Sequence, residues 1–309
     1  MRISPCIVGC DISRQWLDCF VHPDGLRRRF SNDVEGHDAL AALLKEKDGF
    51  CVLEATGPYD RALCRRLHAA GRTFHLANPR KARQFARAAG FLAKSDRVDA
   101  CMLARYGAAI DLPVQARPEP ARAQLRDLME RRDQLVEMRK AERTRLAQPH
   151  PAWHEDSLRQ VIDTLDRQIV AIESRIDALM AACDRLRAQQ DILCSASGIG
   201  PVTARVLLAH MPELGQRNRR AISALAGLAP LACDSGRMHG KRAIWGGRKR
   251  VRDALYMAAL AACRCRPFKP IAQAMRDRGK AAKLVIIAIA RRLLVALNAA
   301  IRHAKAFHT

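Results

Sequence analysis

Hydrophobic and polar positions in the first hundred residues predict a sheet whose strands come first and then alternate with helices. Strand-like stretches of apolar and β-branched residues lie at 3–12, 16–21, 26–30, 50–53 and 73–77. Helix-like stretches lie at 34–47, after Pro58, and from Pro79 and Ser95. The resulting βββαβαβα order predicts an α/β domain with a mixed sheet that is covered by helices.

The middle of the chain reads as helix throughout, after a boundary marked by Pro113, Pro118 and Pro120. Its second half carries an apolar seam at alternating steps of four and three: Leu158, Ile162, Leu165, Ile169, Ile172, Ile176 and Leu179. A weaker seam precedes it, at Leu125, Leu128, Leu135 and Met138. These seams predict an antiparallel helical hairpin or an intermolecular coiled coil, and we favour a role in assembly over a hairpin packed only on its own chain.

The last third has a different composition and predicts a compact, basic, all-helical domain. Helices are expected near 201–210, 219–226, 248–263 and 280–304, with a glycine-rich loop between Cys233 and Gly247. The chain therefore divides into three predicted parts: an α/β domain at 1–117, a helical assembly segment at 118–190 and a basic helical domain at 191–309.

Charge points to the partner of this last part. The whole chain has a formal net charge of +23, and residues 191–309 hold 22 basic and 5 acidic side chains. A solubilising surface is the simpler explanation of a basic domain, but an excess of this size favours a nucleic-acid backbone.

The cysteines and the apolar runs exclude other classes of protein. Eleven cysteines include no CxxC pair, so we expect reduced thiols that fill core positions rather than zinc ligands or disulfides. The start of the chain lacks the apolar core of a signal peptide, and Arg291 and Arg292 interrupt the apolar run at 284–290. We expect a soluble cytoplasmic protein with no membrane partner.

Four carboxylates stand at the ends of predicted elements. Asp11 and Glu54 each end a strand, and Asp96 and Asp99 lie three residues apart on one helix. Carboxylate oxygens are ligands that Mg²⁺ prefers, and two such ions can stabilise the entering and leaving oxygens of a phosphodiester transfer. Taken singly, such acids are more often caps or surface charges, and the spacing of Asp96 and Asp99 alone favours acids that stabilise a helix start.

A second group of residues surrounds Ser235 in the segment CDSGRMHGKRAIWGGRKR. Glycines there allow close approach to a phosphate, and the hydroxyl could bond a phosphate or attack it. Sequence alone favours passive phosphate binding or turn chemistry for Ser235. The cations expected to contact nucleic acid are Arg237, Lys241, Arg242, Arg248, Lys249 and Arg250.

A glycine turn in SASGIGPVTA precedes a predicted helix and presents backbone N–H groups at its N-terminus. Gly198, Gly200 and Thr203 are the residues expected to contact a phosphate in what looks like a helix-hairpin-helix element. A turn of purely structural use is the competing interpretation.

These motifs together resemble the transposases of the IS110 family over the whole chain. The carrying segments are VGCDIS, LEATGPY and KSDRVDA in the first part, and SGIGPVTA, LAGLAP and DSGRMHGKRAIWGGRKRVRDALYMAA in the last. The resemblance implies a RuvC-like (RNase H-like) domain whose DEDD site, Asp11, Glu54, Asp96 and Asp99, binds Mg²⁺. It also implies that Ser235 attacks a phosphodiester to form a phosphoserine link, in a composite site built across subunits of a dimer or tetramer.

The implied partners are double-stranded donor and target DNA and a structured bridge RNA that guides their recognition, in a bacterial, nucleoid-associated setting. The expected function is therefore RNA-guided DNA recombination. Two other functions stay open at this stage. One is a RuvC-like junction nuclease that uses metal-activated water, and the other is a non-catalytic nucleic-acid scaffold.

Overall fold

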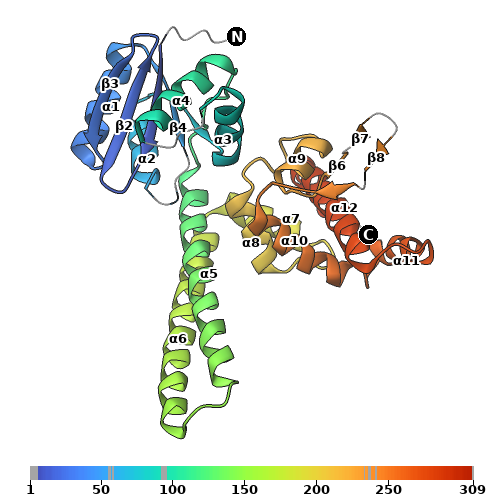
Figure 1. The fold of residues 1–309 in the computed structure, drawn as a ribbon. Coiled ribbons are helices and arrows are strands. Elements are labelled where there is room, and N and C mark those ends of the chain that lie inside the picture. Colours follow the sequence, from blue (N-terminus) through green and yellow to red (C-terminus); the bar gives the residue numbers. More distant parts are fainter. Residues whose placement is uncertain are drawn as a thin grey trace. The chain divides into compact units, whose positions relative to one another are not determined.

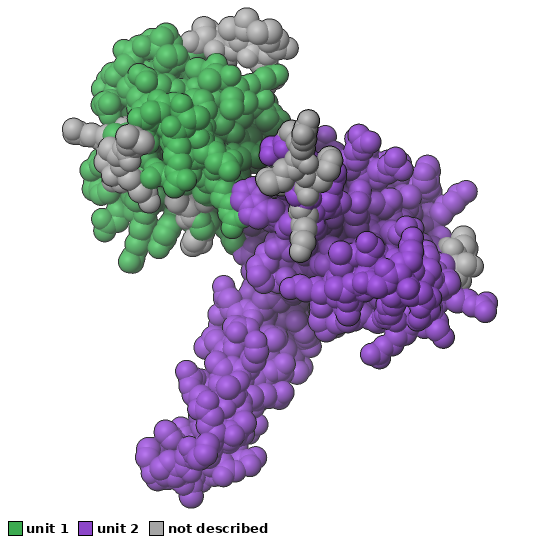
Figure 2. Space-filling model, turned by 45° about the vertical axis from the view of Figure 1, so that its right-hand side comes forward, with its two compact units in different colours: residues 1–117 green, residues 118–309 purple. Residues whose placement is uncertain are grey.

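The computed structural model describes residues 6–54, 57, 59–91, 96–232, 234–235, 238–240 and 242–307, without the side chains of residues 96, 97, 238 and 239. The chain forms two compact units, residues 1–117 and residues 118–309 (Figure 2). The division of the second unit into an assembly segment and a basic domain stays a prediction.

The first unit is built on one five-stranded sheet (Figure 1). Its strands are β1 (Ile7–Ile12), β2 (Trp16–His22), β3 (Leu26–Ser31), β4 (Phe50–Glu54) and β5 (Phe74–Ala77). The strand order is β3-β2-β1-β4-β5, in which β1, β2 and β3 pair antiparallel while β1, β4 and β5 pair parallel. The predicted mixed sheet is confirmed, and β1 is its central strand.

Helices cover both faces of this sheet: α1 (Val34–Glu46), α2 (Arg61–Ala69), α3 (Pro79–Ala88) and α4 (Asp96–Ala109). Alternate residues of β1 contribute to two separate cores, because successive strand side chains point to opposite faces. Val8 and Cys10 pack with α1 and α2, whereas Ile7 packs with α3 and α4. The same alternation determines on which face of the sheet the side chains of Asp11 and Glu54 lie.

Among the cysteines that the structure describes, each is free, and Cys6, Cys10, Cys19, Cys51 and Cys263 are buried. Cys10 and Cys51 are buried in the core under α1 and α2. Burial raises the pKa of the Cys64 thiol to about 12, so this thiol stays protonated and apolar at neutral pH.

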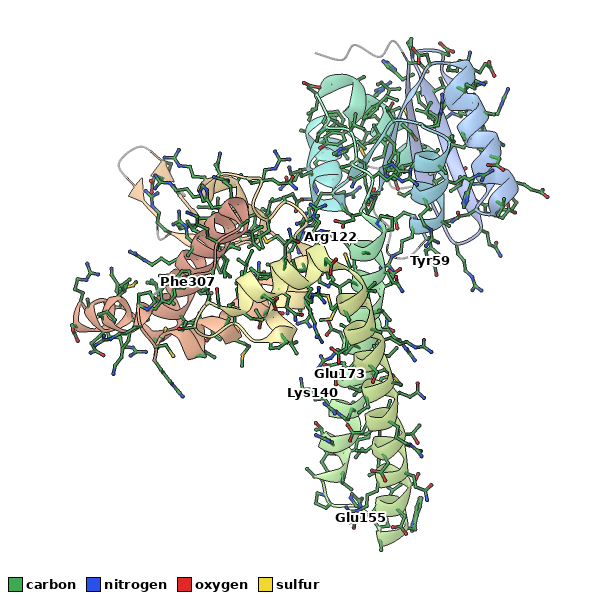
Figure 3. All side chains as sticks on the ribbon, turned by 180° about the vertical axis from the view of Figure 1, so that it is seen from behind. Tyr59, Arg122, Lys140, Glu155, Glu173 and Phe307 are labelled. Atoms are coloured by element: carbon green, nitrogen blue, oxygen red, sulfur yellow. The ribbon has the colours of Figure 1, made fainter. Side chains whose placement is uncertain are left out.

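The second unit begins with a helical hairpin of α5 (Pro120–Leu146) and α6 (Ala152–Ala182). Leu135 packs with Leu165 and Ile169, and ion pairs join Arg132 to Glu173 and Arg139 to Asp166. The later of the two α5 residues, Arg139, pairs with the earlier of the two α6 residues, so the two helices are antiparallel. Figure 3 labels Lys140, Glu155 and Glu173 along them.

One residue of the predicted seam does not lie in it. Met138 is 52% exposed, because the inward position of this part of α5 belongs to Leu135, which is 2% exposed. The seam of α6 is closer to the prediction, with Ile162, Leu165 and Ile169 buried against the hairpin partner. Whether copies of the chain form a coiled coil through this hairpin stays a prediction.

The remainder of the second unit packs helices around a single large core. They are α7 (Asp184–Cys194), α8 (Pro201–His210), α9 (Arg219–Leu225), α10 (Lys249–Ala262), α11 (Phe268–Asp277) and α12 (Ala282–His303). The expected all-helical domain is wrong in one detail, because two short antiparallel strand pairs lie at residues 230–244, with three of their four strands in the segment expected to be a loop. These pairs are β6 (Pro230–Leu231) with β9 (Ala243–Ile244) and β7 (Asp234–Ser235) with β8 (Met238–His239).

Helix α12 is the one helix among the described residues that is long and apolar enough to cross a membrane, judged by length and composition. Its apolar side chains have another use in this fold. Val285, Ile289 and Leu293 are fully buried in the core of the second unit. We therefore interpret α12 as the central core helix of this unit.

Candidate active site and nucleic-acid interface

Strand register brings Asp11 and Glu54 to one edge of the sheet. Strands β1 and β4 are parallel neighbours whose pairing runs from Ile7 opposite Phe50 to Cys10 opposite Leu53. Asp11 and Glu54 are the next residue on each strand, so the two carboxylates lie on adjacent strands at the same carboxyl end. Both side chains are half-buried.

Helix α4 lies over the face of the sheet to which these acids belong. A Cβ on Gly9 would collide with the backbone of Ala100 and Ala104, and a Cβ on Gly107 would meet Ile7 and Val52. Because Asp11 shares its face with Gly9, and Glu54 shares its face with Val52, both acids belong to the α4 side of the sheet.

The same contacts fix the direction of α4. Its later residue, Gly107, lies over the start of β1 at Ile7, while its earlier residues, Ala100 and Ala104, lie over Gly9. The helix therefore runs antiparallel to β1, and its first turn is directed toward the end of the strand that holds Asp11. Asp99 in that first turn is half-buried, and the side chain of Asp96 lies outside the described residues.

The donor set at this edge fits Mg²⁺ in chemistry, since it consists of carboxylate oxygens. Among the described side chains, which leave out Asp96, no group of three or more His, Cys, Asp or Glu residues is placed to hold a metal ion. A magnesium site does not need such a group, because the ion is commonly held by one or two carboxylates together with substrate phosphates and water.

Sequence reasoning missed a fifth acid, Asp18, in this row of side chains. Asp18 pairs with Asp11 across the β1–β2 ladder and with Arg29 across the β2–β3 ladder. Arg29 donates two hydrogen bonds to the Asp18 carboxylate, at 2.8 and 3.0 Å. Like charges directly opposite one another destabilise a sheet, and Arg29 offsets the charge of Asp18. The signal in the sequence was an acid between two buried positions of a strand, Leu17 and Cys19.

A pocket of about 320 Å³ opens beside this acid pair. It is lined by Asp18, Cys19, Arg27, Arg28, Arg29 and Ala100. The arginines come from β3, an edge strand of the sheet whose residues 27–29 are exposed. The acidic edge of the sheet thus has a cationic neighbour that suits a nucleic-acid phosphate.

Ser235 lies on an exposed hairpin arm in the second unit, where β7 pairs with β8. Its neighbour Asp234 accepts hydrogen bonds from the backbone N–H of Gly240, at 3.2 Å, and from Arg242 Nη2, at 3.1 Å. These bonds hold the base of the hairpin together across the turn. Gly236, Arg237 and Lys241, which the sequence placed around Ser235, lie outside the described residues.

The cations that follow this hairpin differ in their ion pairs within the fold and in the exposure of their side chains. Arg248 donates two hydrogen bonds of 2.6 Å to Glu213, and Arg250 Nη2 donates one of 2.6 Å to Asp133 of α5. Lys249 pairs with Asp253 at 2.5 Å, but its side chain is 79% exposed. Among the described cations that the sequence predicted to contact nucleic acid, Lys249 and Arg242 therefore have the most exposed side chains.

The pKa of Glu213 reflects its ion pair with Arg248. Burial favours the neutral acid and raises the pKa of Glu213, but the hydrogen bonds and charge of Arg248 outweigh burial. The pKa of Glu213 is consequently held below its ordinary value. This bidentate pair ties the start of α10 to the segment that follows α8.

The two glycines of the turn before α8 differ: Gly198 is packed against another helix, and Gly200 has open space around it. Gly198 has a φ of +91°, and a Cβ there would lie 2.5 Å from the Ala258 carbonyl oxygen of α10. Gly200 caps the N-terminus of α8, where an added Cβ would meet nothing within 4 Å. Thr203 is half-buried in the first turn. Close packing on α10 thus explains Gly198, whereas Gly200 is accessible to an anion.

Two family models match the chain. The DEDD transposase model of the IS110 type matches residues 8–149, which include all four predicted carboxylates. The model of the IS116/IS110/IS902 transposase family matches residues 190–273, which include Ser235 and the basic segment after it. The chain belongs to the IS110 family of transposases.

Relatives of known name agree with this assignment to the IS110 family. The chain is 28% identical over 320 residues to the pilin gene-inverting protein of Moraxella bovis, an alignment that covers 99% of this chain and 98% of the relative. The corresponding protein of Moraxella lacunata matches equally well. A 43.6 kDa protein of insertion element IS110 from Streptomyces coelicolor is 30% identical over 149 residues, 47% of this chain and 36% of that protein.

Membership of the IS110 family identifies the chain as a transposase, a class of enzyme that recombines DNA. The mixed sheet of the first unit, followed by helices, is consistent with the DEDD nuclease-like fold of that family. DNA binding follows from the same membership.

Proposed function

We propose that this transposase cuts and rejoins DNA through a covalent phosphoserine at Ser235, with Mg²⁺ held at Asp11, Glu54, Asp96 and Asp99. The observation that carries the proposal is the shared edge of Asp11 and Glu54 beneath the first turn of α4. Strand register puts Asp11 and Glu54 at one end of the sheet, and the direction of α4 turns its first turn, which carries Asp99, toward the same end. The cationic pocket beside them supports a role on a phosphate-bearing substrate.

Each residue has a defined part in the proposed strand transfer. Mg²⁺, when bound, stabilises negative charge on the phosphate oxygens. The Ser235 oxygen forms a bond to phosphorus as the bond from phosphorus to one DNA oxygen breaks; the serine loses its proton and the departing DNA oxygen gains one. In the second step a DNA hydroxyl attacks the phosphoserine, transfers its proton to the leaving serine oxygen, and restores the strand. The phosphodiester energy is thereby kept without an external cofactor.

Cleavage assays with four variants test the proposal. Ser235→Ala, Asp11→Asn and Glu54→Gln are each expected to abolish strand transfer in the folded protein. Ser174→Ala is the matched control, since Ser174 is an exposed serine on α6 whose hydroxyl donates to the Val170 carbonyl oxygen within the same helix. Cleavage that survives Ser235→Ala would favour hydrolysis by metal-activated water. Rearrangement that survives both acid variants would favour a non-catalytic scaffold.

A structured guide RNA is the second partner that we propose, alongside donor and target DNA. Its support is the large positive charge of the chain, +23 overall, together with the exposed arginines 27–29 on β3. When the gene is expressed together with its natural flanking DNA, the purified protein is expected to carry an RNA encoded beside the gene. Changing the pairing segment of that RNA should redirect insertion or inversion to a matching DNA site, and unchanged site choice would contradict guidance.

Assembly through the helical hairpin is a further part of the proposal. The hairpin exposes apolar side chains, among them Met138, Trp153 and Val170, with exposed fractions of 52%, 71% and 62%. Exposed apolar surface on one element is typical of an interface. Val170→Glu with Met138→Glu should lower the oligomer mass measured by light scattering. An unchanged mass would place the interface elsewhere.

A further inference from the structure

We propose that Trp245 stacks on an unpaired base of the DNA strand bound beside the Ser235 hairpin. The inference rests on the proposed function, because it takes the strand near Ser235 to be DNA. Trp245 is 61% exposed, although burial of an indole is normally a large source of stability. Tryptophan is scarce in this chain, which has three in 309 residues.

The backbone around Trp245 is held firmly on both sides. Before it, β9 (Ala243–Ile244) pairs with β6. After it, Gly246 and Gly247 adopt φ values of +72° and +66°, which favour glycine, and a Cβ on Gly247 would collide with the backbone of Gly227. The turn therefore has a single shape set by close packing.

Two further bonds fix the far side of this turn. Arg252 Nη1 donates a 2.6 Å hydrogen bond to the Gly246 carbonyl oxygen, and the backbone N–H of Arg248 donates one of 2.9 Å to Leu225. An exposed aromatic side chain on a fixed turn loses little conformational entropy on binding, which is the property of an anchor residue.

The charge around Trp245 selects the partner. Residues 240–252 contain six cations and no acid: Lys241, Arg242, Arg248, Lys249, Arg250 and Arg252. Arg242 and Lys249 lie within four residues of Trp245 in the chain, and their side chains stay 60% and 79% exposed although each pairs with one carboxylate. Exposed cations next to a flat apolar ring suit a ligand that combines phosphates with aromatic faces. An apolar protein surface would have to desolvate those exposed cations and would offer them no further polar partner. A nucleic-acid strand with an unstacked base satisfies both requirements.

The strand is DNA because β7, which bears Ser235, lies in the same segment as β9, which leads into Trp245. Base stacking on an aromatic side chain tolerates any sequence, since every base has a π-face. Trp245 would thus hold a strand open near the reacting phosphate while leaving site choice to other contacts.

Intrinsic fluorescence can observe this contact directly. In full-length protein, Trp16→Phe with Trp153→Phe leaves Trp245 as the sole tryptophan. A DNA duplex with a three-base bulge should quench its emission, while a fully paired duplex of the same sequence should quench it much less. A protein that retains only Trp153 is the control and should not respond. Quenching by a matched RNA bulge but not by DNA would overturn the assignment to DNA.

Affinity measurements separate stacking from charge. Trp245→Ala is expected to weaken binding of the bulged duplex by about 10-fold without changing the dependence of binding on salt, because stacking releases no counterion. Trp245→Phe should retain most of the affinity. Unchanged affinity in Trp245→Ala, or steady Trp245 emission while an electrophoretic assay shows binding, would overturn the inference.

The proposed function can fail or stand independently of this result. Loss of the Ser235-dependent adduct tests strand transfer, whereas quenching of Trp245 tests stacking in a protein that also carries Ser235→Ala. Where Trp245→Ala does not fold, as judged by circular dichroism, Trp245→Phe and the fluorescence measurement decide the inference.

Discussion

Replacement of Gly9 by alanine tests the packing that places the acids together. Gly9 lies at the centre of β1, directly beneath α4. A Cβ built there would lie 3.1 Å from Ala104 Cα and closer than 3.0 Å to both the Ala100 carbonyl oxygen and the Ala104 nitrogen, whereas ordinary contacts begin at 3.4 Å. The obstacle is the backbone of α4, so no side-chain rotation can relieve it. Helix α4 must withdraw by roughly 1 Å.

The size of the effect follows from this overlap. Overpacking of a core costs about 1–3 kcal/mol, so the free energy of unfolding of the first unit should fall by that amount. Activity should fall further than stability, because a displacement of roughly 1 Å at a catalytic group can cost about 100-fold in rate. Withdrawal of α4 moves Asp96 and Asp99 away from Asp11 and Glu54, which stay on the sheet.

Gly107→Ala is the matched control for Gly9→Ala. Its Cβ would meet side chains only, Val52 Cγ2 at 2.6 Å and Ile7 Cγ2 at 2.8 Å, at the end of α4 remote from the acids. We expect a comparable loss of stability by urea denaturation and a much smaller loss of transposition per folded molecule. If Gly9→Ala transposes as well as Gly107→Ala at equal folded fraction, the role of α4 in placing the acids is refuted.

Three further predictions concern ion pairs. Arg248→Ala should lower the free energy of unfolding by about 1–3 kcal/mol, because it leaves the partly buried Glu213 without its ion-pair partner. The pKa of Glu213 is lowered in the fold, so the stability from this pair is present above the unfolded-state pKa near 4.5 and is lost as the pH falls through the lower folded value. Unfolding measured across acid pH should therefore show a smaller loss of stability in the variant than in the unmodified protein. Lys249→Ala should leave the free energy of unfolding nearly unchanged and weaken DNA binding for all sequences. The slope of log binding constant against log salt concentration should become shallower by about 1, and an unchanged slope would show that Lys249 does not contact the DNA. Arg29→Ala should destabilise the first unit by about 0.5–1 kcal/mol by leaving Asp18 opposite Asp11 without its partner, and Asp18→Asn in the same protein should restore part of that loss in denaturation experiments.

Much of the first unit could be predicted from its sequence, because each element carries its own periodicity. A nearly continuous apolar run gives β1 and alternating apolar residues give β2, and an acid near the end of a buried strand, such as Asp11, is conspicuous in the pattern. Register is not encoded in this local way. The pairing that brings Asp18 opposite Asp11 and Arg29 opposite Asp18 depends on the hairpin turns and on which face is buried, so it became visible only in the assembled sheet.

The second unit shows the opposite limit of sequence reasoning. Its long helices follow from apolar periodicity, but Met138 continues the seam by spacing while Leu135 takes the buried place. The two-residue strands β6 to β9 are too short to produce a periodic signal. The number of cations in the basic segment was evident, yet the carboxylates that engage Arg248 and Arg250 come from residues 35 and 117 positions away in the chain. Long-range partners of this kind leave no local trace.

The central claim, that Ser235 becomes covalently joined to DNA in this IS110-family transposase, is tested most directly by mapping the adduct. Protein stopped during strand transfer in Mg²⁺ is denatured, digested with nuclease and protease, and analysed by mass spectrometry. The account predicts a nucleotide attached through phosphate to the peptide that contains Ser235, absent in Asp11→Asn and Glu54→Gln. Active DNA cleavage with Ser235 unmodified, or with the nucleotide on another residue, would contradict it.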